Sequence, residues 1–302
     1  MNAIQLEGLT KTYRTRRGID GLTFSVNEGE TFGFIGPNGA GKSTTIRTLL
    51  GLIHPTGGRA WMLGKDCVRE SAEIKREIGY LPSEVFYYDR MRVKDLLAYS
   101  ASFYKGDHTR RMKELAERME LDLSRRIEDL SFGNKKKVGI VQALLHEPKL
   151  VILDEPTSGL DPLMQQRFFE LLMEEGKKGT TIFFSSHVLS EVQRLCQRVA
   201  IIKEGQLVAL ERVRELTANA NKRVRLETTG EVPSDYFAMQ GVSREERQQG
   251  SIRFLYRGDL APLTAKLAAL PLANLWIEEP DLEEIFLHYY ENHNVRREEE
   301  GA

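Results

Sequence analysis

The chain has 302 residues, 41% of them hydrophobic, so it is long enough for one large domain and a smaller one, each with a proper core. Its 43 Lys and Arg residues balance 44 Asp and Glu residues, and the formal net charge of -1 excludes a global attraction to polyanions such as nucleic acids. The two cysteines, Cys67 and Cys196, have no motif spacing, which argues against a disulfide or a metal site.

Hydropathy and the first residues bear on where the protein resides. No stretch of the sequence approaches the run of about 18 apolar residues that a membrane span needs. The opening residues, MNAIQLEGLTKTYR, lack the apolar segment of a signal peptide. We therefore expect the protein to stay in the cytoplasm.

Short apolar segments alternate with longer segments of helical period, a pattern typical of an α/β domain. Strands are predicted at residues 31–35, 78–81, 151–153, 181–184 and 199–203. Helices are predicted at residues 43–50, 93–104, 110–119, 134–145, 162–175 and 188–196. No motif occurs twice, so we expect one catalytic module.

The pattern changes at residues 216–221, where the small polar segment TANAN forms a predicted linker. Strand-like KRVRLET and SIRFLYR follow, with a helix predicted at 261–270 and a final amphipathic helix at 281–290. These elements predict a small α+β domain over residues 217–302, after a main domain over residues 1–216.

A glycine-rich segment, GPNGAGKST at residues 36–44, follows the apolar strand TFGFI and precedes a predicted helix. It matches the phosphate-loop pattern G-x-x-x-x-G-K-[ST], and this context makes the match specific. The glycines let successive N–H groups point at phosphate oxygens near the positive end of the helix dipole. Lys42 is expected to reach the β- and γ-phosphates of a nucleoside triphosphate, and Ser43 to ligate Mg²⁺. The predicted nucleotide-binding residues are Gly36, Pro37, Asn38, Gly39, Ala40, Gly41, Lys42, Ser43 and Thr44.

Two acidic residues end a second apolar strand, in the segment LVILDEPTSGLD. Asp154 is expected to hold Mg²⁺ through water, and Glu155 to polarise the attacking water as general base. The four aliphatic residues before this pair and the PTSG after it distinguish it from acids in an ordinary turn. His187, in FFSSH at the end of another predicted strand, is expected to donate to the γ-phosphate or to position the water.

Together these motifs make the chain resemble the nucleotide-binding subunit of ATP-binding cassette (ABC) transporters over about residues 2–216. The phosphate loop, the signature-like LSFGN, the strand LVILDE, the SGLD segment and the histidine of SSH occur in the family's order. The resemblance implies a P-loop NTPase cassette with a mixed sheet and a helical subdomain at about residues 84–148. It also implies that Tyr13 stacks on the adenine of ATP, and that Ser158 and Asp161 belong to a loop that reaches a partner cassette.

The segment LSFGNKKKV, residues 130–138, carries three lysines after a glycine turn. A charge run is usually a solvated helix face, but a serine hydroxyl and N–H groups at a helix N-terminus also recognise anions. The resemblance implies that this anion is the γ-phosphate of ATP held by a second copy, so that a head-to-tail homodimer completes two sites and the lysines supply a favourable potential. The signature residues are Leu130, Ser131, Phe132, Gly133 and Asn134, of which Phe132 and Asn134 depart from the commoner LSGGQ form.

Another departure falls in IGYLPSE, where Ser83 stands at the place of a glutamine common in the family, with Glu84 beside it. The resemblance implies that this coupling loop links the nucleotide site to an integral-membrane permease. The tail segment 280–291 resembles the end of exporter cassettes. We therefore expect the ATP-hydrolysing subunit of an export system, at the cytoplasmic face of the membrane.

Two alternative functions share parts of this pattern. A soluble cassette ATPase acting on nucleic acid or ribosomes would have the same motifs, but the lysine run is short and no aromatic residues interleave it. An ATP-binding regulatory subunit without turnover would not need Glu155 beside the metal-binding acid. The expected ligands are therefore ATP and Mg²⁺, with no nucleic-acid partner.

Overall fold

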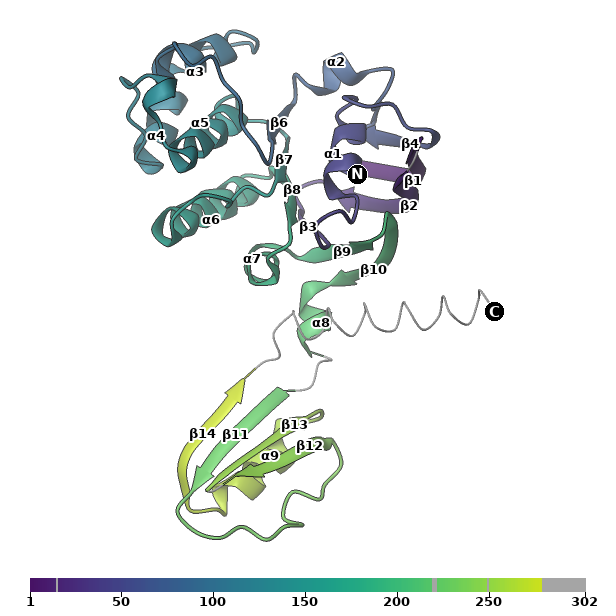
Figure 1. Ribbon diagram of the computed structural model, residues 1–302, viewed down its shortest axis with the longest axis vertical. Helices are drawn as coiled ribbons and strands as arrows, with labels where there is room; N and C mark the ends of the chain where they lie inside the picture. The colour runs from purple at the N-terminus through teal and green to yellow at the C-terminus, as the bar shows by residue number, and fades with distance from the viewer. Residues whose placement is uncertain (15, 219–221, 249, 279–302) are drawn as a thin grey trace. The chain divides into compact units, whose positions relative to one another are not determined.

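The computed structural model of the protein describes residues 1–278 except 15, 219–221 and 249 (Figure 1). The chain divides into two compact units, Met1–Glu211 and Arg212–Ala302, and each is described by itself. Among the described residues, no helix is both long enough and apolar enough to cross a membrane.

An antiparallel sheet in the order β2-β1-β4-β5 forms part of the first unit. Its strands are β1 (Asn2–Tyr13), β2 (Arg16–Asn27), β4 (Gly57–Met62) and β5 (Lys65–Asp66). In the pairing of β1 with β2, Leu6 lies opposite Phe24 and Leu9 opposite Leu22, and all four side chains are buried. This sheet therefore packs one face on the core.

The second sheet has the strand order β10-β9-β3-β8-β7-β6. Its strands are β3 (Thr31–Ile35), β6 (Ile78–Leu81), β7 (Leu150–Asp154), β8 (Thr181–Ser186), β9 (Arg198–Lys203) and β10 (Gln206–Arg212). β3, β7 and β8 are buried at every residue and pair in parallel, as central strands covered on both faces do. Parallel pairing brings the carboxyl ends of these strands to one edge of the sheet, where the motif residues follow them.

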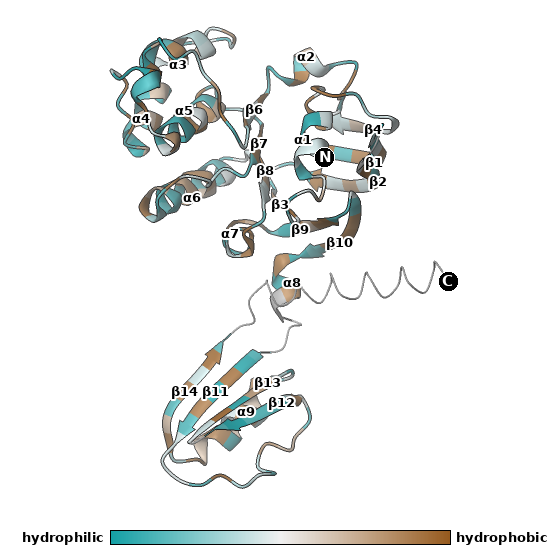
Figure 2. Ribbon diagram, viewed as in Figure 1, coloured by the Kyte–Doolittle hydropathy of each residue, from teal (hydrophilic) through white to brown (hydrophobic). Residues whose placement is uncertain are grey.

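The helices of the first unit are α1 (Lys42–Leu49), α2 (Ser71–Ile74), α3 (Val93–Ala101), α4 (Thr109–Arg118), α5 (Phe132–Leu144), α6 (Pro162–Lys177) and α7 (Leu189–Leu195). Among them, α1, α5, α6 and α7 contact strands of the six-stranded sheet (Figure 1). α5 packs against both α3 and α4, and these three helices form a helical group. Hydrophobic and polar residues alternate around α6 (Figure 2), and Glu175 of this helix pairs with Arg111 of α4 at 2.6 Å.

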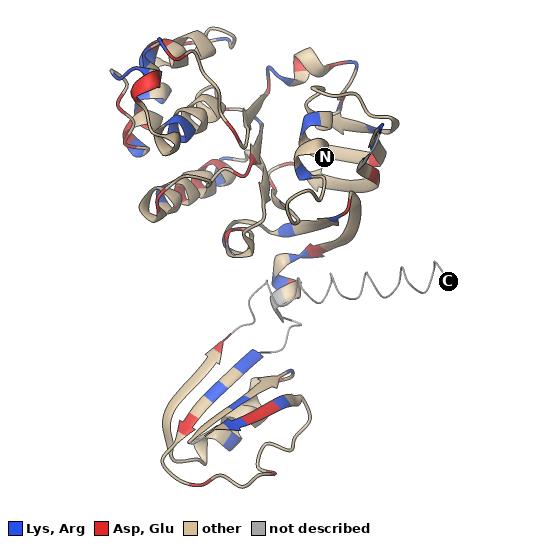
Figure 3. Ribbon diagram, viewed as in Figure 1, with Lys and Arg blue, Asp and Glu red and all other residues tan. Residues whose placement is uncertain are grey.

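The second unit is an antiparallel sheet that packs on one helix. It comprises α8 (Val213–Ala218), β11 (Lys222–Thr228), β12 (Val242–Gln248), β13 (Ser251–Tyr256), α9 (Leu260–Ala268) and β14 (Leu272–Glu278), with strand order β12-β13-β11-β14. Val224 and Leu226 alternate with basic residues along β11 (Figure 3) and join Phe254 and Leu263 in a separate core. The second unit therefore has its own buried cluster.

The predicted fold class is confirmed: an α/β unit with a mixed set of strands precedes a small unit built on an antiparallel sheet. Each strand and helix predicted in the first unit corresponds to an element whose ends differ by about three residues or fewer. The strands β1, β2, β4, β5, β10, β12 and β14 were not predicted. For β1, the register shifts in its pairing with β2 and β4 interrupt the regular alternation that indicates a strand. The helix predicted at 281–290 lies outside the described residues.

Candidate functional site

The phosphate loop connects β3 to α1 and depends on glycines that a larger residue could not replace. A Cβ added to Gly36 would lie 2.4 Å from the carbonyl oxygen of Ile202, and one added to Gly41 would lie 2.7 Å from that of Gly18. Gly41 also has a φ of 107°, in the left-handed region that glycine adopts readily. α1 begins directly after Gly41, so its first N–H groups have no intrahelical acceptor and are available to an anion.

Lys42 is the first residue of α1, and its side chain is only 6% exposed. Its Nζ donates to the carbonyl oxygens of Gly36 at 2.6 Å and Pro37 at 3.3 Å. The same Nζ lies 3.3 Å from Oε1 of Glu155. A buried ammonium group needs such partners, and here they connect the phosphate loop to the acidic end of β7.

Asp154 is the last residue of β7 and is almost fully buried. Burial raises the pKa of its carboxyl group, and hydrogen bonding to Ser43 opposes that shift. Within the described part of the chain, Oδ1 of Asp154 has no hydrogen-bond partner. A carboxylate oxygen of this kind beside a serine hydroxyl suits a hard divalent cation.

Glu155 has a φ of 48°, an uncommon left-handed conformation for a residue other than glycine. Its Oε2 lies 2.7 Å from Nδ1 of His187, which directly follows β8. Because an ionised carboxylate only accepts hydrogen bonds, His187 donates through Nδ1–H, and the neutral ring then presents Nε2 as an acceptor. In that tautomer, Nε2 can accept a hydrogen bond from the attacking water. Nε2 could donate to a phosphate only if the ring were protonated at both nitrogens.

The signature segment begins α5. Ser131 is the N-cap of this helix, and its hydroxyl accepts a hydrogen bond from the N–H of Asn134 at 3.3 Å. The ring of Phe132 is half exposed, and a Cβ added to Gly159 would lie 2.3 Å from that ring. A Cβ added to Gly133 would lie 2.4 Å from the carbonyl oxygen of Gly159. The signature therefore packs directly on the SGLD segment of the same chain.

The three lysines of the run do not share one environment, and their supply of a potential at the helix start stays a prediction. Lys135 is partly exposed and lies 3.8 Å from Asp89. Lys136 is fully buried, and Lys137 is nearly so. The run is therefore part surface and part core.

The buried lysine reaches the coupling loop. Nζ of Lys136 donates to the carbonyl oxygens of Pro82 and Ser83, both at 2.9 Å. Position 136 lies on the same face of α5 as the buried residues Gly139 and Ile140, three and four residues further on. Helical periodicity was the available signal for this burial, and it was missed because the charge pattern was given more weight.

Tyr13 ends β1 and is 47% exposed, with Nζ of Lys11 at 5.5 Å from the ring centroid. Gly18 of β2 lies beside both this ring and the phosphate loop. A Cβ added to Gly18 would be 2.8 Å from the Tyr13 ring and 3.1 Å from the methyl group of Thr44. An exposed ring next to the end of the phosphate loop fits a base-stacking role. No motif marks Gly18, so its place was not predicted.

An open cavity of about 720 Å³ brings several motifs together. It is lined by Asn38, Ser83, Glu84, Val85, Phe86, Leu130, Phe132, Lys135, Glu155, Ser158 and His187. The lining takes residues from the phosphate loop, the coupling loop, the signature, the end of β7 and the end of β8. Motifs far apart in the sequence thus converge on one site.

Asp161 is the N-cap of α6. Its Oδ1 accepts a hydrogen bond from the N–H of Met164 at 3.0 Å, and Pro162 occupies the first helical position. Ser158 is exposed and lines the same cavity as Glu155. The contact of Ser158 and Asp161 with a partner cassette stays a prediction.

Comparison with known proteins agrees with this geometry. A family model described as ABC transporter matches residues 19–158. An uncharacterised ABC transporter ATP-binding protein of Synechocystis sp. is 32% identical over 95% of this chain and 84% of the relative. The linearmycin resistance ATP-binding protein LnrL of Bacillus subtilis is 30% identical over 94% of this chain and 97% of the relative. The solved structure of an ATP-binding subunit of an ABC transporter is 32% identical to this chain and has a TM-score of 0.67. The match covers 71% of this chain and 91% of the solved one.

The chain belongs to the ABC transporter family. It is the ATP-binding subunit of an ABC transport system, and its cassette is an ATPase whose hydrolysis of ATP is coupled to transport.

Proposed function

We propose that two copies of this chain bind ATP between them and power export through a separate membrane permease, from the cytoplasmic face of the membrane. The observation that carries the proposal is the contact of one carboxylate, that of Glu155, with both Lys42 and His187. This arrangement joins a general base, a phosphate-binding cation and a water-positioning imidazole in one site.

Each polar residue of the site has a role in the proposed hydrolysis. Lys42 contacts the β- and γ-phosphates, Glu155 accepts a proton from the attacking water, and His187 orients that water. Ser43 and Asp154 would hold Mg²⁺, which when bound would neutralise phosphate charge. The unpartnered Oδ1 of Asp154 supports this assignment.

The signature supports a head-to-tail homodimer. Ser131 lies exposed at the N-terminus of α5, where N–H groups are available to an anion. We infer that Ser131 and Gly133 of one copy meet the γ-phosphate held by Lys42 of the other, so that one pairing completes two sites. Bound ATP then favours the closed dimer, and hydrolysis removes the bridging contact. The packing of Phe132 on Gly159 supports a joint approach of the signature and the SGLD segment to the partner.

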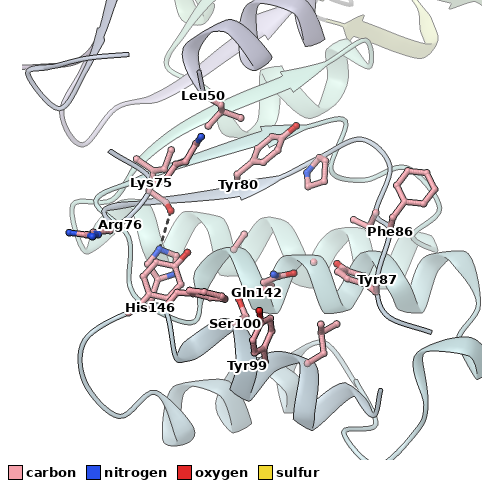
Figure 4. Close-up of a pocket in the computed structure, with 18 of the residues that line it drawn as sticks. Leu50, Lys75, Arg76, Tyr80, Phe86, Tyr87, Tyr99, Ser100, Gln142 and His146 are labelled. Carbon is pink, nitrogen blue, oxygen red and sulfur yellow. Dashed lines mark hydrogen bonds between the residues drawn. The ribbon is translucent and has the colours of Figure 1, made fainter. Parts of the chain in front are cut away.

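A second open cavity, of about 940 Å³, offers a docking site for the permease (Figure 4). Aromatic side chains of the coupling loop, α3 and their surroundings line it, and several are exposed: Phe86, Tyr88, Tyr99 and Phe103. An exposed aromatic patch of this kind is typical of a protein interface. Lys75 and Arg76 also line the cavity, so we infer that its occupant is a cytoplasmic segment of the permease that combines apolar and acidic residues.

The docking cavity is continuous with the coupling loop. Val85 and Phe86 line both this cavity and the one that contains Glu155. A permease segment seated here would therefore touch residues directly beside the nucleotide site. This proximity supports the proposed role of Ser83 and Glu84 in coupling.

The direction of transport is proposed from similarity. The chain matches a linearmycin resistance ATP-binding protein over nearly the full length of both proteins. The tail segment 280–291, which lies outside the described residues, resembles the end of exporter cassettes. Both observations favour export.

The proposal is tested by isolating the tagged full-length chain from its native membranes. We expect a polytopic membrane protein to copurify, together with MgATP-dependent phosphate release that EDTA abolishes. Glu155→Gln is purified in parallel, and the phosphate release that remains in this preparation measures the activity of contaminating ATPases. Tight, salt-sensitive binding of RNA or DNA without any membrane protein would instead favour the nucleic-acid alternative.

A further inference from the structure

Lys136 has no exposed surface, although it carries a charge and lies in the second turn of α5. Its Nζ donates to the carbonyl oxygens of Pro82 and Ser83 at 2.9 Å each. These are the first two residues after β6, where the coupling loop begins. One side chain thus connects the signature helix to the coupling loop.

The same ammonium group lies in the field of the acidic pair. Burial lowers the pKa of Lys136 to about 8, and the charges of Asp154 and Glu155 oppose that shift by favouring the protonated form. Burying a charge is costly unless polar groups surround it. The hydrogen bonds to two carbonyl oxygens and the attraction of the two carboxylates provide that compensation.

The contact acts on the main chain of the loop. The acceptors of the Lys136 hydrogen bonds are main-chain carbonyl groups, so these bonds do not depend on the side chains at positions 82 and 83. Lys137, the next residue of α5, is also nearly buried, whereas the residues from Val138 to Val141 are buried and apolar or glycine. Of the two buried lysines, Lys136 is the one whose Nζ donates to the loop. Lys136 therefore acts as a hydrogen-bond donor to the loop, and its charge interacts with the carboxylates of Asp154 and Glu155.

We propose that Lys136 is a positioning residue that fixes the coupling loop relative to Asp154 and Glu155 and conveys the occupancy of the nucleotide site to that loop. The inference rests on the proposed function of the coupling loop. When MgATP occupies the site, the acidic pair acquires new charged neighbours, the attraction on the Lys136 ammonium changes, and the carbonyl groups that it holds move with it.

The test observes the loop directly and needs no permease. Phe86 is 86% exposed, whereas Cys67 and Cys196 are buried, so Phe86→Cys allows selective labelling with an environment-sensitive maleimide dye. The dye signal is recorded during MgATP titration of the labelled full-length chain and of the same protein with Lys136→Met or Lys136→Arg. Lys113→Met is the matched control, because it removes an exposed lysine of α4 that lines neither cavity.

We expect MgATP to change the signal of the labelled parent and of Lys113→Met alike. Lys136→Met should remove most of the amplitude, because the loop carbonyl groups lose their charged donor, while the Kd for a fluorescent ATP analogue stays within about threefold of the parent. Lys136→Arg should restore most of the amplitude, because it keeps the charge and the donors.

A full amplitude in Lys136→Met overturns the inference, as does a parent that binds ATP without any change in signal. A parent that does not bind ATP overturns the proposed function, and the inference with it. Thermal unfolding monitors the folding of each variant. Should Lys136→Met not fold, Lys136→Gln replaces it, because glutamine keeps N–H donors for the loop but lacks the charge.

Discussion

Nζ of Lys42 lies 3.3 Å from Oε1 of Glu155, so the phosphate-binding cation and the proposed general base form an ion pair within the site. The other carboxylate oxygen meets His187 at 2.7 Å. The ion pair with Lys42 at one oxygen and the hydrogen bond from His187 at the other both favour this orientation of the carboxylate. The chemistry of the site therefore depends on both Lys42 and Glu155, and a substitution at each of them tests its role.

Glu155→Gln keeps the shape of the side chain but removes the base. We expect kcat for ATP hydrolysis to fall about 10²–10⁴-fold, with ATP still bound, so that the closed dimer accumulates. Phosphate release gives the rate, and light scattering at saturating MgATP gives the mass. Glu117→Gln, at an exposed position of α4, should behave like the parent. A Glu155→Gln protein that stays monomeric under these conditions would count heavily against the proposed head-to-tail homodimer.

Lys42→Met removes the cation of the phosphate loop. A hydrogen bond that involves a charged group contributes about 1.5–3 kcal/mol, so we expect the affinity for ATP to fall by about 10–100-fold. Competition against a fluorescent ATP analogue measures this change. Lys94→Met, at an exposed position of α3, is the control. Unchanged affinity in Lys42→Met would contradict the assignment of the phosphate loop.

The packing of Phe132 on Gly159 predicts a coupled pair of substitutions. Gly159→Ala places a Cβ 2.3 Å from the Phe132 ring, at a φ of 80°, and should lower the free energy of unfolding by about 1–3 kcal/mol. Phe132→Ala in the same protein removes the overlap, so the two effects should depart from additivity by more than about 0.5 kcal/mol. Urea unfolding of the two single variants and the double variant completes the cycle.

Gly179 provides the control for this pair. It also has a positive φ, of 97°, but a Cβ added there would meet nothing within 4 Å. Gly179→Ala should therefore show the backbone cost alone, about 1 kcal/mol. Additive effects of Phe132→Ala and Gly159→Ala would mean that the ring and the loop adjust independently.

His146, in the wall of the cavity of about 940 Å³, predicts a pH dependence of stability (Figure 4). Its ring stacks on Tyr104 with centroids 3.7 Å apart, and its Nε2 donates to the carbonyl oxygen of Ile78 at 3.1 Å. In the described part of the chain, Nδ1 is buried without a hydrogen-bond partner. A proton added at Nδ1 would therefore be buried without an acceptor, and burial lowers the pKa of His146 to about 4.

The folded pKa of His146 lies below the value of about 6.5 expected in the unfolded chain. The unfolded chain therefore binds the proton first as pH falls. The stability that neutral His146 contributes is fully present above about pH 6.5 and is lost between there and pH 4, with a slope of at most about 1.4 kcal/mol per pH unit.

Urea unfolding at pH 7, 6 and 5 measures this loss. His146→Gln should show a shallower decline than the parent over that range, because glutamine does not titrate. His54→Gln, at an exposed position, should follow the parent. Equal slopes for the parent and His146→Gln would show that another group controls acid stability.

Among the strands of the first unit, the sequence predicted those whose residues are mostly buried. β3 and β7 are continuous apolar runs because both of their faces are covered, so their bounds were nearly right from the sequence alone. β1 and β2 alternate buried and polar positions and shift register at several bulges. That irregularity breaks the period of two on which strand prediction depends.

The candidate site divides in a similar way. The phosphate loop and the acidic pair are local motifs, so a short stretch of sequence was enough to predict them. The roles of Gly18 and Lys136 arise from contacts with segments far away in the chain, such as Thr44 for Gly18 and Pro82 for Lys136. No local pattern reports such contacts, because they exist only after the segments have packed.

The proposed nucleotide site draws on two sheets: Tyr13 belongs to the antiparallel sheet, and the phosphate loop follows β3 of the six-stranded sheet. The sheets share a core in which Phe24 stacks on Phe32 at 5.6 Å. ATP bound to both sheets therefore opposes their separation, and at a hundred times its Kd it adds about 2.7 kcal/mol to the free energy of unfolding. A cell with ample ATP would thus protect the cassette from proteolysis, and energy starvation would shorten its lifetime.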